Sequence, residues 1–400
     1  MSQPESTLTF PVGPERPFDL TDVYIRRLTE DPISPVRLGS GQRAWLVTRY
    51  EDVRALLRDS RISADATRPG FPVVTPQVQA DPDSLRMLIR MDPPEHGHFR
   101  RMLTREFTIG QIEAMRPAIE RIVDDCLDAM AGATPPVDLV DALALPVPSR
   151  VICDLLGVPY HDHAFFQDRA RAILRHDSTV SDVRDAFAEL DDYLHRLVAG
   201  KEDQPTDDLL GRLISDRESP GDLSRQDLVE MARLLLVAGH ETTANMIGLG
   251  TLVLLQNPVE LDRLRADPSL VAGTVEELLR FCTIVRIGLQ RVALADIEIG
   301  GQTIRAGDGV IPLLSTANRD PAEFDHPDRL DVGRDAHGHV AFGFGPHQCL
   351  GQALARIELQ VVFARLVDRF ATLRLAVPAE SVPLRHDMLV YGTHELPVTW

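Results

Sequence analysis

Residues 342–351 read FGFGPHQCLG and place Cys349 between a glycine-rich stretch and a helical pattern. Apolar residues from 350 to 370 recur at helical spacing, so Cys349 lies at the entrance of a predicted helix. At that position free amides and the helix macrodipole favour a thiolate over a thiol. Gly343 and Gly345 permit positive φ and close approach of backbone amides to the sulfur. The stretch therefore indicates a cysteine whose sulfur is positioned to react or to bind a metal.

The local sequence alone leaves several roles open for Cys349. It fits an unreactive thiol at a helix start, a nucleophile, a zinc ligand, or the ligand of another metal or of a haem. Zinc prefers four protein ligands in structural sites, and only His347 is near in sequence. A nucleophile needs a base, for which His347 is a weak candidate. The other cysteines, Cys126, Cys153 and Cys282, lie far apart in apolar helical stretches and are predicted to be reduced core residues.

The bulk composition indicates a soluble, cytoplasmic protein. The chain has 400 residues, is 44% hydrophobic, and carries 42 basic against 60 acidic residues, a net charge of -18. Such acidity argues against nucleic acid and against an anionic membrane surface as partners. The polar, proline-rich start shows no secretory signal. The apolar stretch 234–255 contains His240, Glu241 and Asn245, so we expect a buried helix and no membrane span.

A long helix is predicted in the middle of the chain. Ser224 and Asp227 form a capping box, and Pro258 ends the helical pattern after Asn257. A helix over about 225–256 would be roughly 50 Å long, which is enough to cross the whole protein.

The remaining patterns predict a mainly α fold with a minor β region. Alternation and turn signals place the β-rich parts at about 35–50, 289–316 and 371–400. Residues 61–83 read as a long irregular segment. No internal boundary is evident, so we expect a single domain over 1–400.

The cysteine stretch resembles the haem-binding signature of the cytochrome P-450 family, Phe-Gly-x-Gly-x-His-x-Cys-x-Gly, extended here by Leu350 and by Ala355-Arg356. The resemblance, closest to soluble actinobacterial members, implies the P-450 fold with the long helix crossing over the haem. It implies haem b as cofactor, O2 as co-substrate and Cys349 as the iron ligand. The loop residues implied to bind the cofactor are Phe342, Gly343, His347, Cys349 and Gly351.

A second stretch in the long helix, residues 238–242 with the sequence AGHET, resembles the family's oxygen-binding groove. The resemblance implies that Ala238 and Gly239 contact the cofactor, and that Glu241 and Thr242 deliver protons during catalysis. The alternative is a glycine that serves helix packing and a threonine bonded to the carbonyl four residues earlier.

Further positions resemble the family's haem-propionate contacts and its buried charge network. His96 and Arg100 share a helix face at i, i+4 spacing. With Arg291 and His347 they are implied to bind the propionates. Glu277 and Arg280 match a Glu-x-x-Arg pair that is buried in the family with a later arginine, here assigned to Arg329. Each pair alone also fits a solvated helix face.

The resemblance implies a monooxygenase that hydroxylates or epoxidises a bulky apolar molecule, with a polyketide, macrolide or terpenoid of secondary metabolism as the first expectation. A broad-specificity steroid or xenobiotic hydroxylase is the alternative, and a non-catalytic haem-thiolate protein or a peroxygenase are further rivals. Electrons are expected from a ferredoxin and an NAD(P)H-dependent reductase, docked near Arg100, Arg101, Arg105 and Arg356, and the enzyme is expected to be a monomer. The implied substrate pocket includes Val237, Val285, Arg286, Ile287, Leu289, Leu389 and Val390. Arg286 is the polar exception there, which would meet a polar substrate group or turn to solvent.

Overall fold

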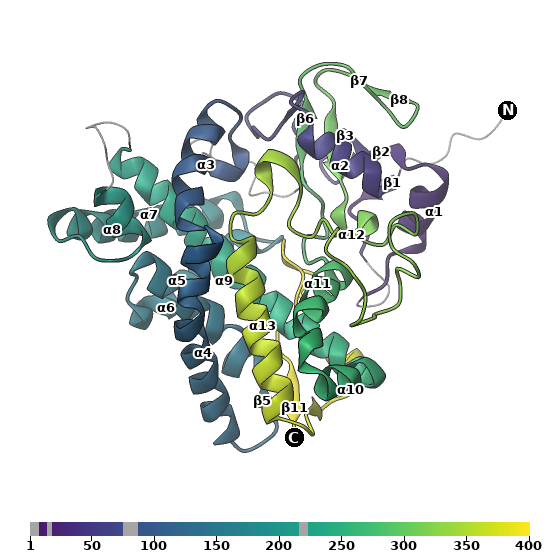
Figure 1. The fold of residues 1–400 in the computed structure, drawn as a ribbon. Helices are drawn as coiled ribbons and strands as arrows, with labels where there is room; N and C mark the ends of the chain where they lie inside the picture. The colour runs from purple at the N-terminus through teal and green to yellow at the C-terminus, as the bar shows by residue number, and fades with distance from the viewer. Residues whose placement is uncertain (1–7, 14–17, 75–86, 216–222) are drawn as a thin grey trace.

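The computed structural model describes residues 8–13, 18–74, 87–215 and 223–400. Helices dominate it, and most strands lie at the upper right of Figure 1, while a smaller group lies at the bottom near the C-terminus. The α-helices are α1 (Asp22–Glu30), α2 (Tyr50–Arg58), α3 (Glu95–Glu106), α4 (Ile109–Ala131), α5 (Pro146–Leu156), α6 (His163–Leu174), α7 (Val180–Asp203), α8 (Leu209–Ser215), α9 (Arg225–Gln256), α10 (Pro258–Ala266), α11 (Val271–Cys282), α12 (Leu314–Ala317) and α13 (Gln352–Arg369). The prediction of a mainly α fold is confirmed.

The long predicted helix is α9, and its bounds agree with the sequence patterns. The Ser224 hydroxyl accepts from the Asp227 amide while the Asp227 carboxylate accepts from the Ser224 amide, which is the predicted capping box. The helix packs against α5, α7, α11 and α13, so its apolar residues are buried nearly all round. α9 therefore lies in the core, and its middle can form one wall of an internal site.

The main sheet lies beside α1 and α2 (Figure 1). Its strand order is β1-β2-β3-β9-β6-β4. The bounds are β1 (Leu8–Phe10), β2 (Ile33–Leu38), β3 (Arg43–Val47), β4 (Ile62–Ser63), β6 (Arg291–Ala293) and β9 (Gly309–Pro312). β2 and β3 form the expected hairpin, whose turn includes Gly41 at φ 85°. A separate hairpin of β7 (Ile297–Ile299) and β8 (Gln302–Ile304) turns at Gly300-Gly301.

The C-terminal part has less regular β structure than its sequence suggested. Between β10 (Arg374–Leu375) and β11 (Pro397–Thr399) the backbone forms turns and single bridges, such as Leu384 to Thr393. Pro378 and Pro383 lack an amide donor, which limits strand pairing there. β11 lies between β10 and β5 (Val137–Asp138) and ties the C-terminal segment to the helical part.

Among the described residues, no helix is both long enough and apolar enough to cross a membrane. In the middle of α9, the polar residues His240 and Glu241 interrupt the apolar sequence, and both are fully buried within the protein.

Candidate active site

A large cavity lies between the middle of α9 and the segment around Cys349. It contains about 1660 Å³ of space not filled by protein atoms, including its mouth. The described apolar side chains that line it include Leu88, Ile89, Phe107, Ile152, Leu234, Leu235, Met246, Leu279, Ile284, Val285, Leu289, Leu314, Leu350, Leu354 and Leu359. Such a lining favours an apolar ligand.

The α9 wall of the cavity includes Ala238, Gly239 and Thr242. A Cβ on Gly239 would lie 2.8 Å from Cδ1 of Ile152, so the glycine allows α5 to pack closely at this point. The Thr242 hydroxyl donates to the Ala238 carbonyl at 2.8 Å. Thr242 therefore combines the two interpretations of its motif: it lines the cavity and bonds to the carbonyl four residues earlier.

Glu241 is buried behind this wall and forms an ion pair with an arginine far away in sequence. Arg385 Nη1 donates to Glu241 Oε2 at 2.5 Å. Glu241 Oε1 and His240 Nε2 have no hydrogen-bond partner among the described residues, and they lie 4.0 Å apart. Arg385 was not predicted, because nothing in its local sequence connects it to α9.

The Cys349 loop has the backbone shape that its glycines allow. Gly343 and Gly345 have φ of 71° and 74°. A Cβ on Gly345 would lie 2.4 Å from the Leu57 carbonyl oxygen, so the loop packs directly on the end of α2. The Cys349 amide donates to the Phe342 carbonyl at 2.8 Å and closes the loop.

The Cys349 side chain faces the cavity, and the surrounding protein buries the sulfur away from bulk water. This burial raises the pKa of the Cys349 thiol, whereas the Gly351 and Gln352 amides and the charges of Arg100 and Arg356 lower it. The expected stabilisation of a thiolate by amides is present, but burial outweighs it. A metal ion in place of the thiol proton would resolve this conflict.

The cavity lining also carries imidazole and guanidinium groups. The rings of His96 and His347 lie 4.1 Å apart between centroids, and Arg100 and Arg291 also line the cavity. Burial and the neighbouring arginines lower the pKa of His347 to about 3, and burial lowers that of His96. His96 Nε2 is buried without a hydrogen-bond partner among the described residues. The four side chains thus offer donors to an anion.

These features fit a haem. The Cys349 sulfur could serve as an iron ligand, and Ala238 and Gly239 of α9 line the same cavity. The unpartnered nitrogen of His96 and the arginine cluster match the carboxylates of a porphyrin.

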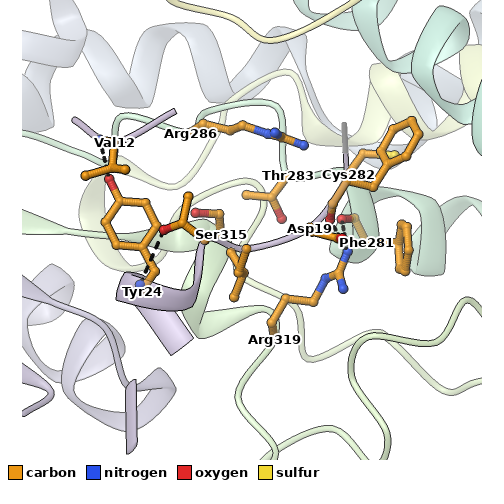
Figure 2. A pocket seen from close by; sticks show the side chains of 12 residues that line it. Val12, Asp19, Tyr24, Phe281, Cys282, Thr283, Arg286, Ser315 and Arg319 are labelled. Atoms are coloured by element: carbon orange, nitrogen blue, oxygen red, sulfur yellow. Dashed lines mark hydrogen bonds between the residues drawn. The ribbon is translucent and has the colours of Figure 1, made fainter. Parts of the chain in front are cut away.

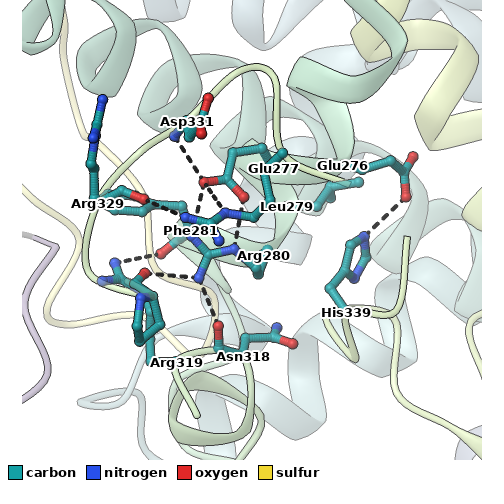
Figure 3. Close-up of polar contacts among 12 residues, drawn as sticks. Glu276, Glu277, Leu279, Arg280, Phe281, Asn318, Arg319, Arg329, Asp331 and His339 are labelled. Atoms are coloured by element: carbon teal, nitrogen blue, oxygen red, sulfur yellow. Dashed lines mark hydrogen bonds and ion pairs between the residues drawn. The ribbon is translucent and has the colours of Figure 1, made fainter. Parts of the chain in front are cut away.

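Glu277 and Arg280 form the predicted buried pair on α11. Arg280 Nε donates to Glu277 Oε2 at 2.7 Å, and both side chains are fully buried. Figure 3 shows this pair beside Asp331, while the Arg329 side chain extends away from it. The assignment of Arg329 is wrong: its side chain is 71% exposed. Arg334 instead donates from Nε to Glu277 Oε1 at 3.2 Å, because a turn at 331–334 directs it back to α11.

Replacing Arg334 is therefore expected to destabilise the protein more than replacing Arg329. Arg334→Met removes a hydrogen bond to a buried carboxylate, which should lower the free energy of unfolding by about 2 kcal/mol. Arg329→Met changes an exposed side chain and should alter it by less than about 0.5 kcal/mol. Urea unfolding followed by circular dichroism measures both, and equal losses would contradict the assignment of Arg334.

A second buried network lies next to the first and was missed by the sequence reasoning. Glu276 accepts from Arg356 Nε at 2.7 Å, and its other oxygen lies 3.1 Å from His339 Nε2. These hydrogen bonds lower the pKa of Glu276 to about 2 despite its burial. Arg356 also lies over the Phe342 ring, 4.7 Å from its centroid. The network links α11, the cysteine loop and α13.

Glu358 on α13 is a buried acid that lines the cavity. Its Oε2 has no hydrogen-bond partner among the described residues, and burial raises the pKa of its carboxyl well above the usual value. We expect a neutral carboxylic acid at this position, since no cation offsets the loss of hydration.

This protonation predicts a pH dependence of stability. Glu358 takes up a proton on folding. Above the unfolded pKa of about 4.3, Glu358 therefore lowers the free energy of unfolding by about 1.4 kcal/mol for each pH unit, until the pH reaches the folded pKa. Glu358→Gln removes this term. Urea unfolding of the holoprotein at pH 5 to 8 should show the variant gaining stability over the wild type as pH rises. Parallel profiles, as expected for the exposed Glu380→Gln, would contradict a neutral Glu358.

The structure divides the residues expected in the substrate pocket. Val285 and Leu289 line the large cavity, whereas Val237, Arg286, Ile287, Leu389 and Val390 do not. Arg286 instead lies over the Tyr391 ring, 3.6 Å from its centroid, and lines a separate small pocket with Asp19, Cys282 and Arg319 (Figure 2). The expectation that Arg286 lines the substrate pocket is therefore wrong: it lines the separate pocket and is partly exposed.

The irregular segment up to residue 90 was also expected to line the pocket, and Leu88, Ile89 and Arg90 at its end do line the cavity, whereas 75–86 lies outside the described residues. Other lining residues were not predicted. Ile152 from α5 and Leu234 from α9 had only the signal of apolar residues in helical patterns, which is shared by the whole core.

The fold and this site define a haem-thiolate monooxygenase. A family model described as cytochrome P450 matches residues 165–389, and the chain belongs to this family. It is 51% identical over 399 residues to cytochrome P450-SU2 of Streptomyces griseolus, covering 99% of this chain and 98% of that protein. It is 48% identical to pentalenic acid synthase of Streptomyces avermitilis, with both chains covered fully.

A solved structure shows the same fold. The mycinamicin VIII C21 methyl hydroxylase MycCI from Micromonospora griseorubida, bound to mycinamicin VIII, matches with a TM-score of 0.93 and 43% identity, covering 98% of this chain and 100% of that chain. As a member of the family, the chain uses haem b and O2 for monooxygenation.

Proposed function

We propose that the enzyme oxidises a C–H or C=C position of a bulky apolar polyketide, macrolide or terpenoid, and that residues 1–400 act as a single domain. The observation that carries this proposal is the apolar lining of the large cavity on the side of α9, by Leu234, Leu235 and Met246. The relatives named after mycinamicin and pentalenic acid support the same substrate classes.

Different residues of the site would bind different parts of the haem. Cys349 would hold the haem iron, and His96, Arg100, Arg291 and His347 would hold the propionates. The haem, when bound, supplies oxygen activation and the oxidation of the substrate carbon.

The protein itself controls protons and water. The Thr242 hydroxyl faces the cavity and can pass a proton to a group bound there. Glu241 is the next carboxylate along α9, and its ion pair with Arg385 keeps it ordered and buried. The apolar wall excludes water from the reacting position, which limits wasteful proton delivery.

Electrons are proposed to come from a ferredoxin and its NAD(P)H-dependent reductase, with the enzyme a monomer in the cytoplasm. The docking surface would include Arg101 and Arg105, which are exposed on α3. Arg356 no longer fits this role, because it is engaged by Glu276 and Phe342.

A direct test screens natural products against the ferric holoenzyme for a shift of the haem spin state. Ligands that shift it are then incubated with ferredoxin, reductase and NADPH, and products are identified by mass spectrometry. We expect hydroxylated or epoxidised products from a macrolide or terpenoid. Turnover only of small polar compounds would contradict the proposal.

A further inference from the structure

One end of the active-site cavity holds more positive charge than the haem accounts for. Arg90, Arg100 and Arg291 all line the cavity. Within the described residues, no carboxylate lies in ion-pair distance of any of them. The nearby Asp92 is already used: it accepts from Ser63 Oγ, from the Ala64 amide and from Arg68 Nε.

A charge count makes this excess explicit. In a ferric haem with a thiolate ligand, the porphyrin dianion and the thiolate cancel the charge of the iron. Only the two propionates then remain to neutralise the three guanidinium groups. Among the residues that the structure describes, one guanidinium is therefore left without an anion, which is costly in an apolar cavity.

Arg90 is the guanidinium that best fits this surplus. Arg100 lies four residues after His96 on α3, and its electrostatic interaction with Cys349 places it at the cysteine side. Arg291 is 6% exposed and donates to the Gln290 carbonyl at 2.8 Å. Arg90 instead belongs to the turn Leu88–Arg90, whose apolar residues also line the cavity.

The contacts of Arg90 hold it in place but leave its charge unmatched. Its Nη2 lies 3.4 Å from Gln290 Oε1, which is a long hydrogen bond, and its Cζ lies 5.0 Å from the Phe71 ring centroid. Burial lowers the pKa of Arg90 to about 10, and no anion of the described part of the chain offsets this effect. A flat aromatic ring on one side and an amide on another keep the guanidinium oriented without neutralising it.

We propose that Arg90 binds a carboxylate of the substrate, so that the substrate is a bulky apolar molecule with an acid group at one end. This inference rests on the proposed function of the cavity. The anionic end would be anchored beside Phe71 and Gln290, and the apolar body would lie along the side chains of α9. The oxidised carbon is then distant from the acid group.

The test compares an acid with its neutral ester. Abietate, a diterpene acid, and methyl abietate are bound to the wild-type holoenzyme at pH 7.5 by equilibrium dialysis, which does not depend on turnover. We expect the wild type to bind the acid about 10- to 100-fold more tightly, the range of a hydrogen bond to a charged group. Arg90→Met should abolish this preference and Arg90→Lys should keep part of it. Arg37→Met, a charge loss on the exposed face of β2, should leave it unchanged.

Haem content and the carbon monoxide spectrum of each variant separate this role from propionate binding. If Arg90→Met loses haem, or if the wild type does not prefer the acid, the inference is overturned. The inference is supported if the preference for the acid is lost in Arg90→Met and kept in Arg37→Met. A failure to form product with ferredoxin would contradict only the proposed function.

Discussion

Replacing Cys349 with serine is expected to abolish monooxygenase activity. A serine hydroxyl does not provide the thiolate that donates electron density to the iron. Loss of a supporting group around a metal typically costs 10- to 100-fold, so loss of the ligand itself should cost more than about 100-fold. The reduced protein with carbon monoxide should also lose the strongly red-shifted Soret band. Because the Cys349 side chain is exposed to the cavity, we expect the fold to survive the change.

Cys126→Ser is the matched control for this experiment. Cys126 lies in α4 as a core residue and does not line the active-site cavity, so we expect it to have no part in iron binding. The control should keep the red-shifted band. A Cys349→Ser protein with intact circular dichroism that also keeps the band would refute Cys349 as the ligand.

Thr242→Ala is expected to separate oxygen consumption from product formation. The variant loses the hydroxyl that faces the cavity, and general acid catalysis by a positioned group contributes about 100-fold or more. Product formation should therefore fall by roughly that factor, while NADPH is still consumed and hydrogen peroxide accumulates. The measurement is the ratio of product to NADPH in the system with ferredoxin and reductase.

Two variants control for this effect. Thr242→Ser keeps a hydroxyl and should retain most of the coupling. Thr251→Ala removes a threonine of α9 that donates to the carbonyl four residues earlier at the same 2.8 Å, but this residue does not line the active-site cavity. If Thr251→Ala uncouples the enzyme as strongly as Thr242→Ala, the effect belongs to the helix and not to proton delivery.

The buried charge network shows the limit of reasoning from motifs. Glu277 and Arg280 were predicted correctly because they are three residues apart on one helix, where geometry is known in advance. Their partner comes from an irregular segment, in which the direction of a side chain depends on each turn. Arg329 and Arg334 both precede the cysteine loop, and only the turn at 331–334 decides that Arg334 reaches Glu277.

Arg286 and Arg385 illustrate the same limit inside the site. Val285 lines the cavity and Arg286 does not, because a turn begins at Arg286 and its side chain lies over the Tyr391 ring. Arg385 reaches Glu241 from 144 positions away in the chain, and no local pattern indicates such a contact.

The sequence by itself determined the class of the enzyme and the long helix 225–256, and it is the source of our proposals for the iron ligand and for the propionate donors. These rest on short stretches whose helical or glycine-dependent geometry is local. Only the tertiary structure decided which arginine completes the buried network, which one holds Glu241 and which one remains unmatched in the cavity. Those contacts join residues that are distant in the chain, and packing of the whole molecule brings them together.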